Sequence, residues 1–372
     1  MVYNPANIVN FFEKPLPLCK YFAVMTAILR NIGILIILST ISLLTACTSA
    51  DRYVTLSGYA QGGTYAVKIN MKGVSVPVKE VRDSVDALLK CIDKSLSGYN
   101  KNSILSRLNA GETVEPDSLF LDIYDRAYEI FETTGGVVDV ASAPLFDLWG
   151  FGFTSDSLPS DEDVTKVLVS SGMARLKRQM PSPVNGELLL KECGSVLPKL
   201  NYNAIAQGYS CDVVARYLYS IGVKDMLVDI GEIFCDGLNP SGKPWTVGID
   251  RPVDGNNTPG EQIQGIFRSP SGPHGIVTSG NYRKYYVRDG KKYAHTIDPR
   301  TGYPVGHNLL SATIVAEDAT LADAYATYCM VVGLEESIAF LESSDDLEGC
   351  LIYDRDGILE SWCSDGFVLE TM

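Results

Sequence analysis

The sequence predicts an α+β fold, made of mixed but largely antiparallel sheets flanked by helices. Two patterns predict it: short runs of alternating apolar residues indicate strands, and apolar residues at helical spacing indicate helices. The strands occur in clusters with helices between the clusters, without the strict alternation that predicts a parallel sheet. The chain has 372 residues, of which 46% are hydrophobic, so it can bury a substantial core.

The first predicted elements are a hairpin and two helices. Residues 53–58 and 64–69 alternate around Gln61-Gly62-Gly63 and predict two strands joined by a tight turn. Apolar residues then recur at helical spacing in two segments: Val81, Val85, Leu88, Leu89 and Ile92, and later Leu119, Ile123, Tyr124, Ala127, Ile130 and Phe131. Gly135 and Gly136 are expected to end the second helix.

The second half of the chain predicts two more helices around a series of strands. Residues 203–221 predict a helix that Gly222 ends, and residues 320–332 a helix that Gly333 ends. Strands are expected at residues 226–230, 233–235, 245–249, 263–267, 275–279, 294–297 and 311–316, with a last hairpin at 350–353 and 358–359. Residues 156–161 and 254–260 are rich in turn formers, but neither segment is long enough to require a domain boundary.

The net charge of −14 and the isoelectric point near 4.7 limit the classes of partner that the protein could bind through charge. An acidic protein is not expected to bind nucleic acid or anionic lipid surfaces through unspecific charge. An anionic ligand would therefore need a metal ion or local backbone amides to receive it.

The N-terminal segment is typical of a targeting signal. Residues 32–44 form an apolar run after Arg30, too short to span a bilayer comfortably, and end in Leu44-Thr45-Ala46-Cys47, which is typical of a bacterial lipobox. Cys47 would then receive diacylglycerol. We expect a lipoprotein signal over residues 1–46, with Met25 as an alternative start, and one mature domain over residues 47–372 tethered outside the cytoplasm. A simple anchor or a cleaved secretory peptide is the alternative.

The cysteines do not predict a metal site. Besides Cys19 in the signal and Cys47 there remain Cys91, Cys193, Cys211, Cys235, Cys329, Cys350 and Cys363. Their number is odd and no pair has C-x-x-C spacing, which argues against zinc. We expect small buried hydrophobic roles, although an oxidising compartment would allow one or two disulfides.

Two local patterns could carry chemistry. Residues 295–302 place a histidine, a carboxylate and a guanidinium around a turn, although a turn that Asp298 merely caps, with His295 packed beside it, fits equally. Asp323 and Thr327 are four residues apart on a predicted helix, so their oxygens could share one hard cation such as Mg²⁺. A threonine bonded to its own helix is the plainer explanation. The amides of Gly208-Tyr209 could face a phosphate, although no phosphate-loop motif is present.

Seven motifs follow one another along the chain. They are S-G-Y at 97–99, G-G-V-V-D at 135–139, N-A-I-A-Q-G-Y at 203–209, W-T-V-G-I at 245–249, T-S-G-N-Y at 278–282, H-T-I-D-P-R-T-G at 295–302 and A-D-A-Y-A-T at 322–327. In order and spacing, from about Gly62 to the C-terminus, the series resembles the ApbE family, the FAD:protein FMN transferases.

The resemblance implies an ApbE-like fold and a Mg²⁺-dependent enzyme that moves FMN from FAD onto a threonine hydroxyl of a target flavoprotein and releases AMP. The acceptor would be a subunit of a membrane redox complex or a similar protein, with the threonine in an Asp…Ser/Thr-Gly-Ala-Thr motif. Many members are lipoproteins, so the lipobox fits a protein anchored to the cell membrane and facing the periplasm.

The resemblance also implies site residues. Asp323 and Thr327, with the backbone carbonyls of Ala204 and Ala326, would bind the metal. His295 and Asp298 would lie at the reacting phosphates, and either could accept the threonine proton. The flavin nucleotide would be lined by Gly62, Tyr99, Val137, Val138, Asp139, Asn201, Gln207 and Ile297.

Three positions depart from the usual motifs. Gln207 stands where many relatives have Lys or Glu, Ile230-Gly231 where many have two glycines, and Ala204 where some have Thr. Two other functions stay open: a periplasmic Mg²⁺-dependent FAD pyrophosphatase that gives FMN and AMP, and a flavin-binding lipoprotein without turnover.

Overall fold

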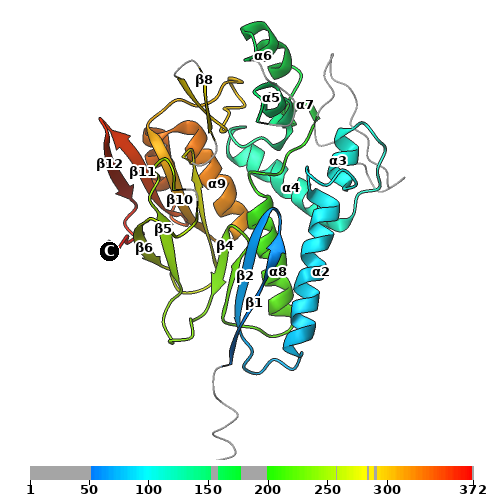
Figure 1. The fold of residues 1–372 in the computed structure, drawn as a ribbon, viewed down its shortest axis with the longest axis vertical. Helices are drawn as coiled ribbons and strands as arrows, with labels where there is room; N and C mark the ends of the chain where they lie inside the picture. The colour runs from blue at the N-terminus through cyan, green and yellow to red at the C-terminus, as the bar shows by residue number, and fades with distance from the viewer. Residues whose placement is uncertain are drawn as a thin grey trace, which may run out of the picture. The chain divides into compact units, whose positions relative to one another are not determined.

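An eight-stranded sheet organises the computed structural model, which describes residues 52–151, 158–176, 199–256, 258–282, 285–288 and 291–370 (Figure 1). Its strands are β1 (Tyr53–Ala60), β2 (Gly63–Asn70), β3 (Met226–Asp229), β4 (Ile233–Asp236), β7 (His274–Gly280), β10 (Leu309–Ala316), β11 (Glu348–Arg355) and β12 (Ile358–Cys363). They neighbour one another in this order, and every pairing is antiparallel. Two separate hairpins are formed by β5 (Thr246–Asp250) with β6 (Ile263–Arg268), and by β8 (Tyr285–Arg288) with β9 (Lys291–Ala294).

Helices cover one face of the sheet. The longer ones are α2 (Val78–Leu96), α4 (Ser118–Thr133), α8 (Ala206–Ser220), α9 (Ala319–Val332) and α10 (Leu334–Glu342). The shorter ones are α3 (Ile104–Asn109), η1 (Val140–Ser142), α5 (Ala143–Leu148), α6 (Asp161–Leu168) and α7 (Met173–Leu176). In Figure 1, α8 packs on β3 and β4, α9 packs on β7 and β10, and the two helices lie side by side. This face of the sheet therefore presents two adjacent helix N-termini.

Successive residues of the central strands belong to two different cores. Val277 and Ile314 pack with α9 and α10, whereas their neighbours Ile276 and Val315 pack on the other face against β5 and β6. Because side chains alternate along a strand, a strand covered on both faces becomes a continuous apolar run. A third core joins α2, α4 and α8 to β1, β2 and β3.

The predicted fold class is confirmed, and most elements lie where the periodicity placed them. The first hairpin turns at Gln61 and Gly62, which both have positive φ angles (51° and 80°). The helix expected from residue 203 begins only at Ala206, after a turn. The sequence did not predict α10, because its nine residues follow Gly333 directly and are too few to show a clear period.

The strand expected at residues 294–297 is wrong. Strand β9 ends at Ala294, and Ile297 makes only an isolated bridge to Pro304. The hydroxyl of Thr296 donates to Oδ1 of Asn281 at 2.7 Å, so this residue is fixed by a side chain and not by a strand partner. The apolar alternation of this segment reflects burial in a loop.

The two turn-rich segments that the sequence analysis considered do not separate domains in the described part of the chain. Residues 254–260 belong to the loop that joins β5 to β6, where residue 257 is not described, and residues 156–157 also lie outside the described part. Residues Arg52–Met372 group as one compact unit. The helices of the described residues include none long and apolar enough to cross a membrane, and the apolar run 32–44 and Cys47 lie outside those residues.

The described cysteines are mostly buried, as expected. Cys91 is exposed and Cys363 is half-buried, while Cys193 is outside the described residues. Cys350 and Cys363 lie directly opposite each other on β11 and β12, with their Sγ atoms 2.6 Å apart, and both are thiols in the structure. This pair is where one of the disulfides that the sequence allowed could form.

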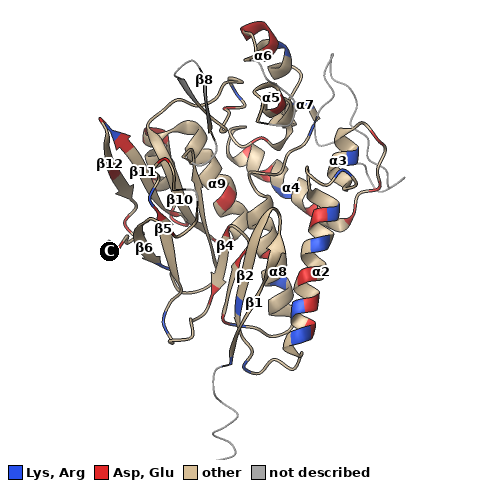
Figure 2. Ribbon diagram, viewed as in Figure 1, with Lys and Arg blue, Asp and Glu red and all other residues tan. Residues whose placement is uncertain are grey.

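Charged side chains are interleaved on the outer face of α2, as Figure 2 shows. Lys79 and Asp83, one turn apart, form an exposed ion pair of 2.7 Å. Alternating charge of this kind is typical of a solvated helix face. It does not form the basic surface that a phosphate-bearing partner would need.

Candidate active site

The N-terminal turns of α8 and α9 touch at Gly208. A Cβ atom on Gly208 would lie 2.1 Å from the carbonyl oxygen of Ala319 and 2.9 Å from Cβ of Asp323. Only glycine therefore fits between the two backbones at this separation. Asp323 is 4% exposed, and its carboxylate accepts the backbone N–H of Gly208 at 3.1 Å.

This contact caps the start of α8. The helix begins at Ala206 with Ile205 as its N-cap residue, so Gly208 is the third helical residue and its amide has no acceptor within the helix. Asp323 supplies that acceptor, and no described residue donates to the carbonyl of Ala204, which lies just before the helix. The amide is therefore not available to a phosphate, contrary to one sequence expectation, while the carbonyl oxygen of Ala204 remains open to a ligand.

Thr327 lies one turn after Asp323 on α9 and is half-buried. Within the described part of the chain its hydroxyl makes no hydrogen bond, so the plainer explanation of this pair, a threonine bonded to its own helix, does not hold. Ala326 is fully buried in mid-helix, where its carbonyl regularly receives the amide four residues on. It is thus less open than Ala204 to the role that the resemblance implies.

Burial raises the pKa of Asp323 well above its usual range. The hydrogen bond from Gly208 works in the opposite direction, and the neighbouring Asp212 raises the pKa further. A nearby cation would favour the ionised form. No three His, Cys, Asp or Glu side chains cluster within the described residues. The donors are a carboxylate, a hydroxyl and a carbonyl, and such hard oxygen ligands fit Mg²⁺.

The hairpin turn and Gln207 lie on the same part of α8. Nε2 of Gln61 donates to the hydroxyl of Ser210, which anchors the turn with the exposed Gly62 over the first turns of α8. Nε2 of Gln207 donates to the carbonyl of Ile230 at 3.2 Å. Gly231, at φ +93°, approaches Gln207 so closely that a Cβ would lie 2.3 Å from Nε2. The residues that depart from the family pattern, Gln207 and Ile230-Gly231, therefore contact each other.

The loop after α4 contributes mainly buried groups. Val137 and Val138 are buried, and the carboxylate of Asp139 accepts the amides of Ala141 at 2.8 Å and Met173 at 3.0 Å. Burial raises the pKa of Asp139 to about 6, although these amides lower it. Asp139 therefore holds two loop segments together.

Asn201 and Tyr99, which the resemblance also places at the nucleotide, differ in their surroundings. The amide of Asn201 donates to the carbonyl of Val140 at 2.7 Å, which brings Asn201 beside the Val137 to Asp139 segment. Tyr99 is 67% exposed, near the start of the loop that follows α2. The structure thus brings Asn201 and the valine pair together and leaves Tyr99 at the surface.

The segment 295–302 forms a tight turn that Asp298 stabilises. The carboxylate of Asp298 accepts Nε and Nη2 of Arg300 at 3.0 and 2.9 Å, and its own carbonyl accepts the amide of Gly302 at 2.8 Å. His295 is half-buried and precedes this turn. The capped-turn interpretation of the sequence is therefore correct for Asp298, and a catalytic role of the segment would rest on His295.

A small separate core holds this turn in place. Ile297 packs with Leu145, Trp149 and Val164. The indole Nε1 of Trp149 donates to the carbonyl of Gly302 at 2.8 Å, which joins the end of α5 to the 295–302 motif, 153 residues further along the chain. Nothing in the sequence indicated this contact. Ile297 is 4% exposed, so any contact with a ligand would use its backbone.

The fold and the donor set define an α+β protein with a candidate hard-cation site between two helix N-termini. Its family follows from comparison with known proteins. The chain belongs to the ApbE family, whose family model matches residues 61–351.

The relatives cover most of the chain. It is 33% identical to the FAD:protein FMN transferase of Vibrio cholerae over 334 residues, 88% of this chain and 95% of that protein. It is also 33% identical to the FAD:protein FMN transferase of Escherichia coli K12 over 301 residues, 78% of this chain and 82% of that protein.

Solved structures of two flavin transferases have the same fold as this chain. The flavin transferase ApbE from Vibrio cholerae matches with a TM-score of 0.71 at 31% identity, covering 85% of this chain and 98% of that one. The apo form of the Pseudomonas stutzeri flavinyl transferase ApbE matches with a TM-score of 0.71 at 28% identity, covering 85% and 95%. The expected ApbE-like fold is therefore confirmed.

Proposed function

We propose that the chain is a Mg²⁺-dependent FAD:protein FMN transferase. It would move FMN from FAD to a threonine hydroxyl of an acceptor flavoprotein: an ester bond to the FMN phosphate forms, the pyrophosphate bond breaks, AMP leaves and the threonine proton is lost. The names of the relatives support this reaction. The structural observation that carries it is the bond from the Gly208 amide to the buried Asp323, which holds this carboxylate at the start of α8, where the carbonyl of Ala204 accepts no hydrogen bond from a described residue.

Asp323, Thr327 and Ala204 would hold the metal ion. When bound, Mg²⁺ neutralises the charge of the pyrophosphate and so favours departure of AMP. Positive charge for this task is scarce in the protein, because its net charge is −14 and the guanidinium of Arg300 in the 295–302 turn is paired with Asp298. The Ala326 carbonyl completes the set that the family resemblance implies.

His295 is our assignment for the proton acceptor. Asp298 was the other candidate, but its carboxylate oxygens both accept hydrogen bonds from Arg300. A carboxylate engaged in this way is a poor acceptor for a further proton. Asp298 would instead fix the turn that carries His295.

The nucleotide would lie along the N-terminus of α8. Gln207 offers an uncharged side-chain amide where many relatives have a charge, so its contact with FAD would be a neutral hydrogen bond. Gly62, Tyr99, Asn201 and the Val137 to Asp139 segment would line the rest of the nucleotide.

A mass-spectrometric assay tests the reaction. The mature chain from Thr48 is mixed with FAD, Mg²⁺ and an acceptor domain that carries the threonine motif, and both the acceptor mass and free AMP are followed. We expect a covalent FMN adduct on the threonine, lost when EDTA is added. Free FMN and AMP without adduct, repeated with a second acceptor, would make the chain an FAD pyrophosphatase. FAD binding without turnover would make it a binding protein.

We also propose that Cys47 anchors the protein to the cell membrane, facing the periplasm. The support is the sequence alone: an apolar run of signal length and the lipobox tetrapeptide. In cells, we expect the N-terminal peptide to begin at Cys47 with a lipid mass added, and Cys47→Ser to release the protein from the membrane fraction. An unmodified Cys47, or a mature chain that keeps residues 1–46, would contradict the proposal.

A further inference from the structure

A carboxylate on α8 caps the helix that carries Asp323. Asp212 is 8% exposed, and its Oδ1 accepts the backbone N–H of Ala319 at 2.9 Å. Its Oδ2 accepts the backbone N–H of Thr320 at 2.9 Å and the Thr320 hydroxyl as well. The first amides of a helix have no partner within the helix, so a neighbouring element supplies one here.

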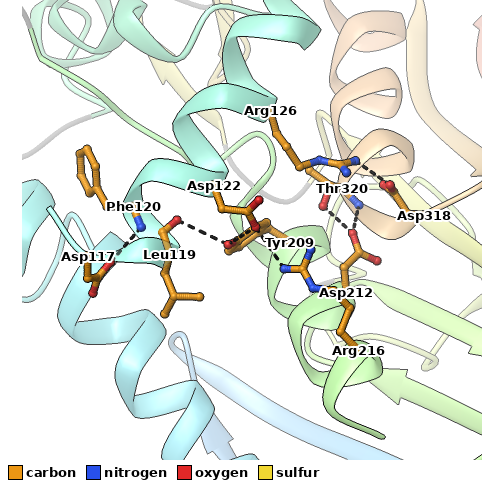
Figure 3. A network of polar contacts seen from close by, with 10 residues as sticks. All are labelled: Asp117, Leu119, Phe120, Asp122, Arg126, Tyr209, Asp212, Arg216, Asp318 and Thr320. Carbon is orange, nitrogen blue, oxygen red and sulfur yellow. Dashed lines mark hydrogen bonds and ion pairs between the residues drawn. The ribbon is translucent and has the colours of Figure 1, made fainter. Parts of the chain in front are cut away.

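The next amide of α9 has a separate partner. Asp318 is the N-cap residue and accepts the amide of Leu321 at 2.8 Å, while its other oxygen accepts Nη2 of Arg126 from α4 at 2.6 Å. Figure 3 shows the Arg126–Asp318 and Asp212–Thr320 contacts together: Arg126 lies on α4, Asp212 on α8 and Thr320 on α9, with Asp318 just before α9. The start of α9 is therefore held from two sides.

The contacts between α8 and α9 are reciprocal. Gly208 and Asp212 are one turn apart on α8 and face the same side. A carboxylate of α8 accepts amides of α9, and the carboxylate of Asp323 on α9 accepts the Gly208 amide of α8. With the backbones in contact at Gly208, these bonds determine the register between the two helices. That register decides whether Asp323 reaches the Gly208 amide.

We propose that Asp212 is a positioning residue for the metal site. It does not bind the ion, because both of its oxygens are used by α9. It holds Asp323 against Gly208 at the start of α8, which follows Ala204 in the chain. This inference rests on the proposed function, since it concerns the same cation.

Mg²⁺ binding to the chain from Thr48, measured by calorimetry without FAD or acceptor, tests the proposal. Asp212→Asn keeps the size of the side chain but removes its charge and one of its acceptors. We expect the dissociation constant for Mg²⁺ to rise about tenfold, as expected for loss of a helix cap. Thr320→Val removes only the hydroxyl donor, so we expect a smaller rise in the dissociation constant for Mg²⁺. This second variant provides the test if Asp212→Asn does not fold.

Asp122→Asn is the matched control. Asp122 on α4 also bonds to α8, accepting from Tyr209 at 2.7 Å and Arg216 at 3.2 Å (Figure 3), and within the described part of the chain it makes no hydrogen bond to α9. The Asp122→Asn variant should bind Mg²⁺ with the affinity of the parent, even if its melting temperature is lower.

The outcomes separate the two proposals. If the parent binds Mg²⁺ and both variants bind it equally well, Asp212 is only structural and the inference is wrong, while the proposed function stands. If the parent itself binds no Mg²⁺, the metal assignment fails and the inference fails with it.

Discussion

Replacing Asp323 with asparagine should reduce Mg²⁺-dependent transfer by about 10³-fold or more, because the site loses its only charged ligand. The same change should not unfold the protein. The amide oxygen of asparagine can still accept the Gly208 amide, and burial already disfavours the charged form of Asp323. In EDTA we expect an unchanged or slightly higher melting temperature. The transfer assay and thermal unfolding measured on the same preparation check both parts.

Asp345→Asn is a matched control, since Asp345 is exposed in the loop after α10 and is not one of the site residues. It should change neither transfer nor melting temperature. If Asp323→Asn kept full Mg²⁺-dependent transfer, the assignment of the metal site would be wrong. If Asp323→Asn lost transfer because the variant does not fold, the prediction of an unchanged melting temperature would be wrong. The loss of transfer would then give no information about the metal.

Gly208→Ala should give the largest loss of stability among single methyl additions in this region. The added Cβ would lie 2.1 Å from the Ala319 carbonyl oxygen, which is backbone and cannot rotate away. The helices must separate, at a cost of about 3 kcal/mol or more in the free energy of unfolding. For a chain of this size we expect the melting temperature to fall by roughly 5–10 °C. Because separation also breaks the bond from Gly208 to Asp323, Mg²⁺ binding should weaken too.

Gly306→Ala is the control for this change. A Cβ at Gly306 would have no atom within 4 Å, and its φ angle is not in the left-handed region. We expect a change within about 0.5 kcal/mol and unaltered Mg²⁺ binding. Thermal unfolding of both variants in EDTA, followed by Mg²⁺ titration, makes the comparison. Equal stability of Gly208→Ala and the parent would show that α8 and α9 are not in backbone contact.

The sequence by itself determined the local elements and the identity of several candidate ligands. Alternation predicts the hairpin of β1 and β2, and helical spacing places Asp323 and Thr327 on one face of α9. These properties depend on residues that are close in the chain, and periodicity reports on such neighbours directly. The order of the seven motifs was also visible, and it led to the correct family.

The tertiary structure alone decided how these parts meet. Residue spacing could not predict the contacts of Asp212, because its partners Ala319 and Thr320 are more than 100 residues away in the chain. The capping of the Gly208 amide likewise depends on the distant Asp323. Local patterns also failed at residues 294–297, where burial in a loop produces the same alternation as a strand. Hydrophobic periodicity records which residues are buried, whereas the partner of each buried polar group depends on how the elements pack.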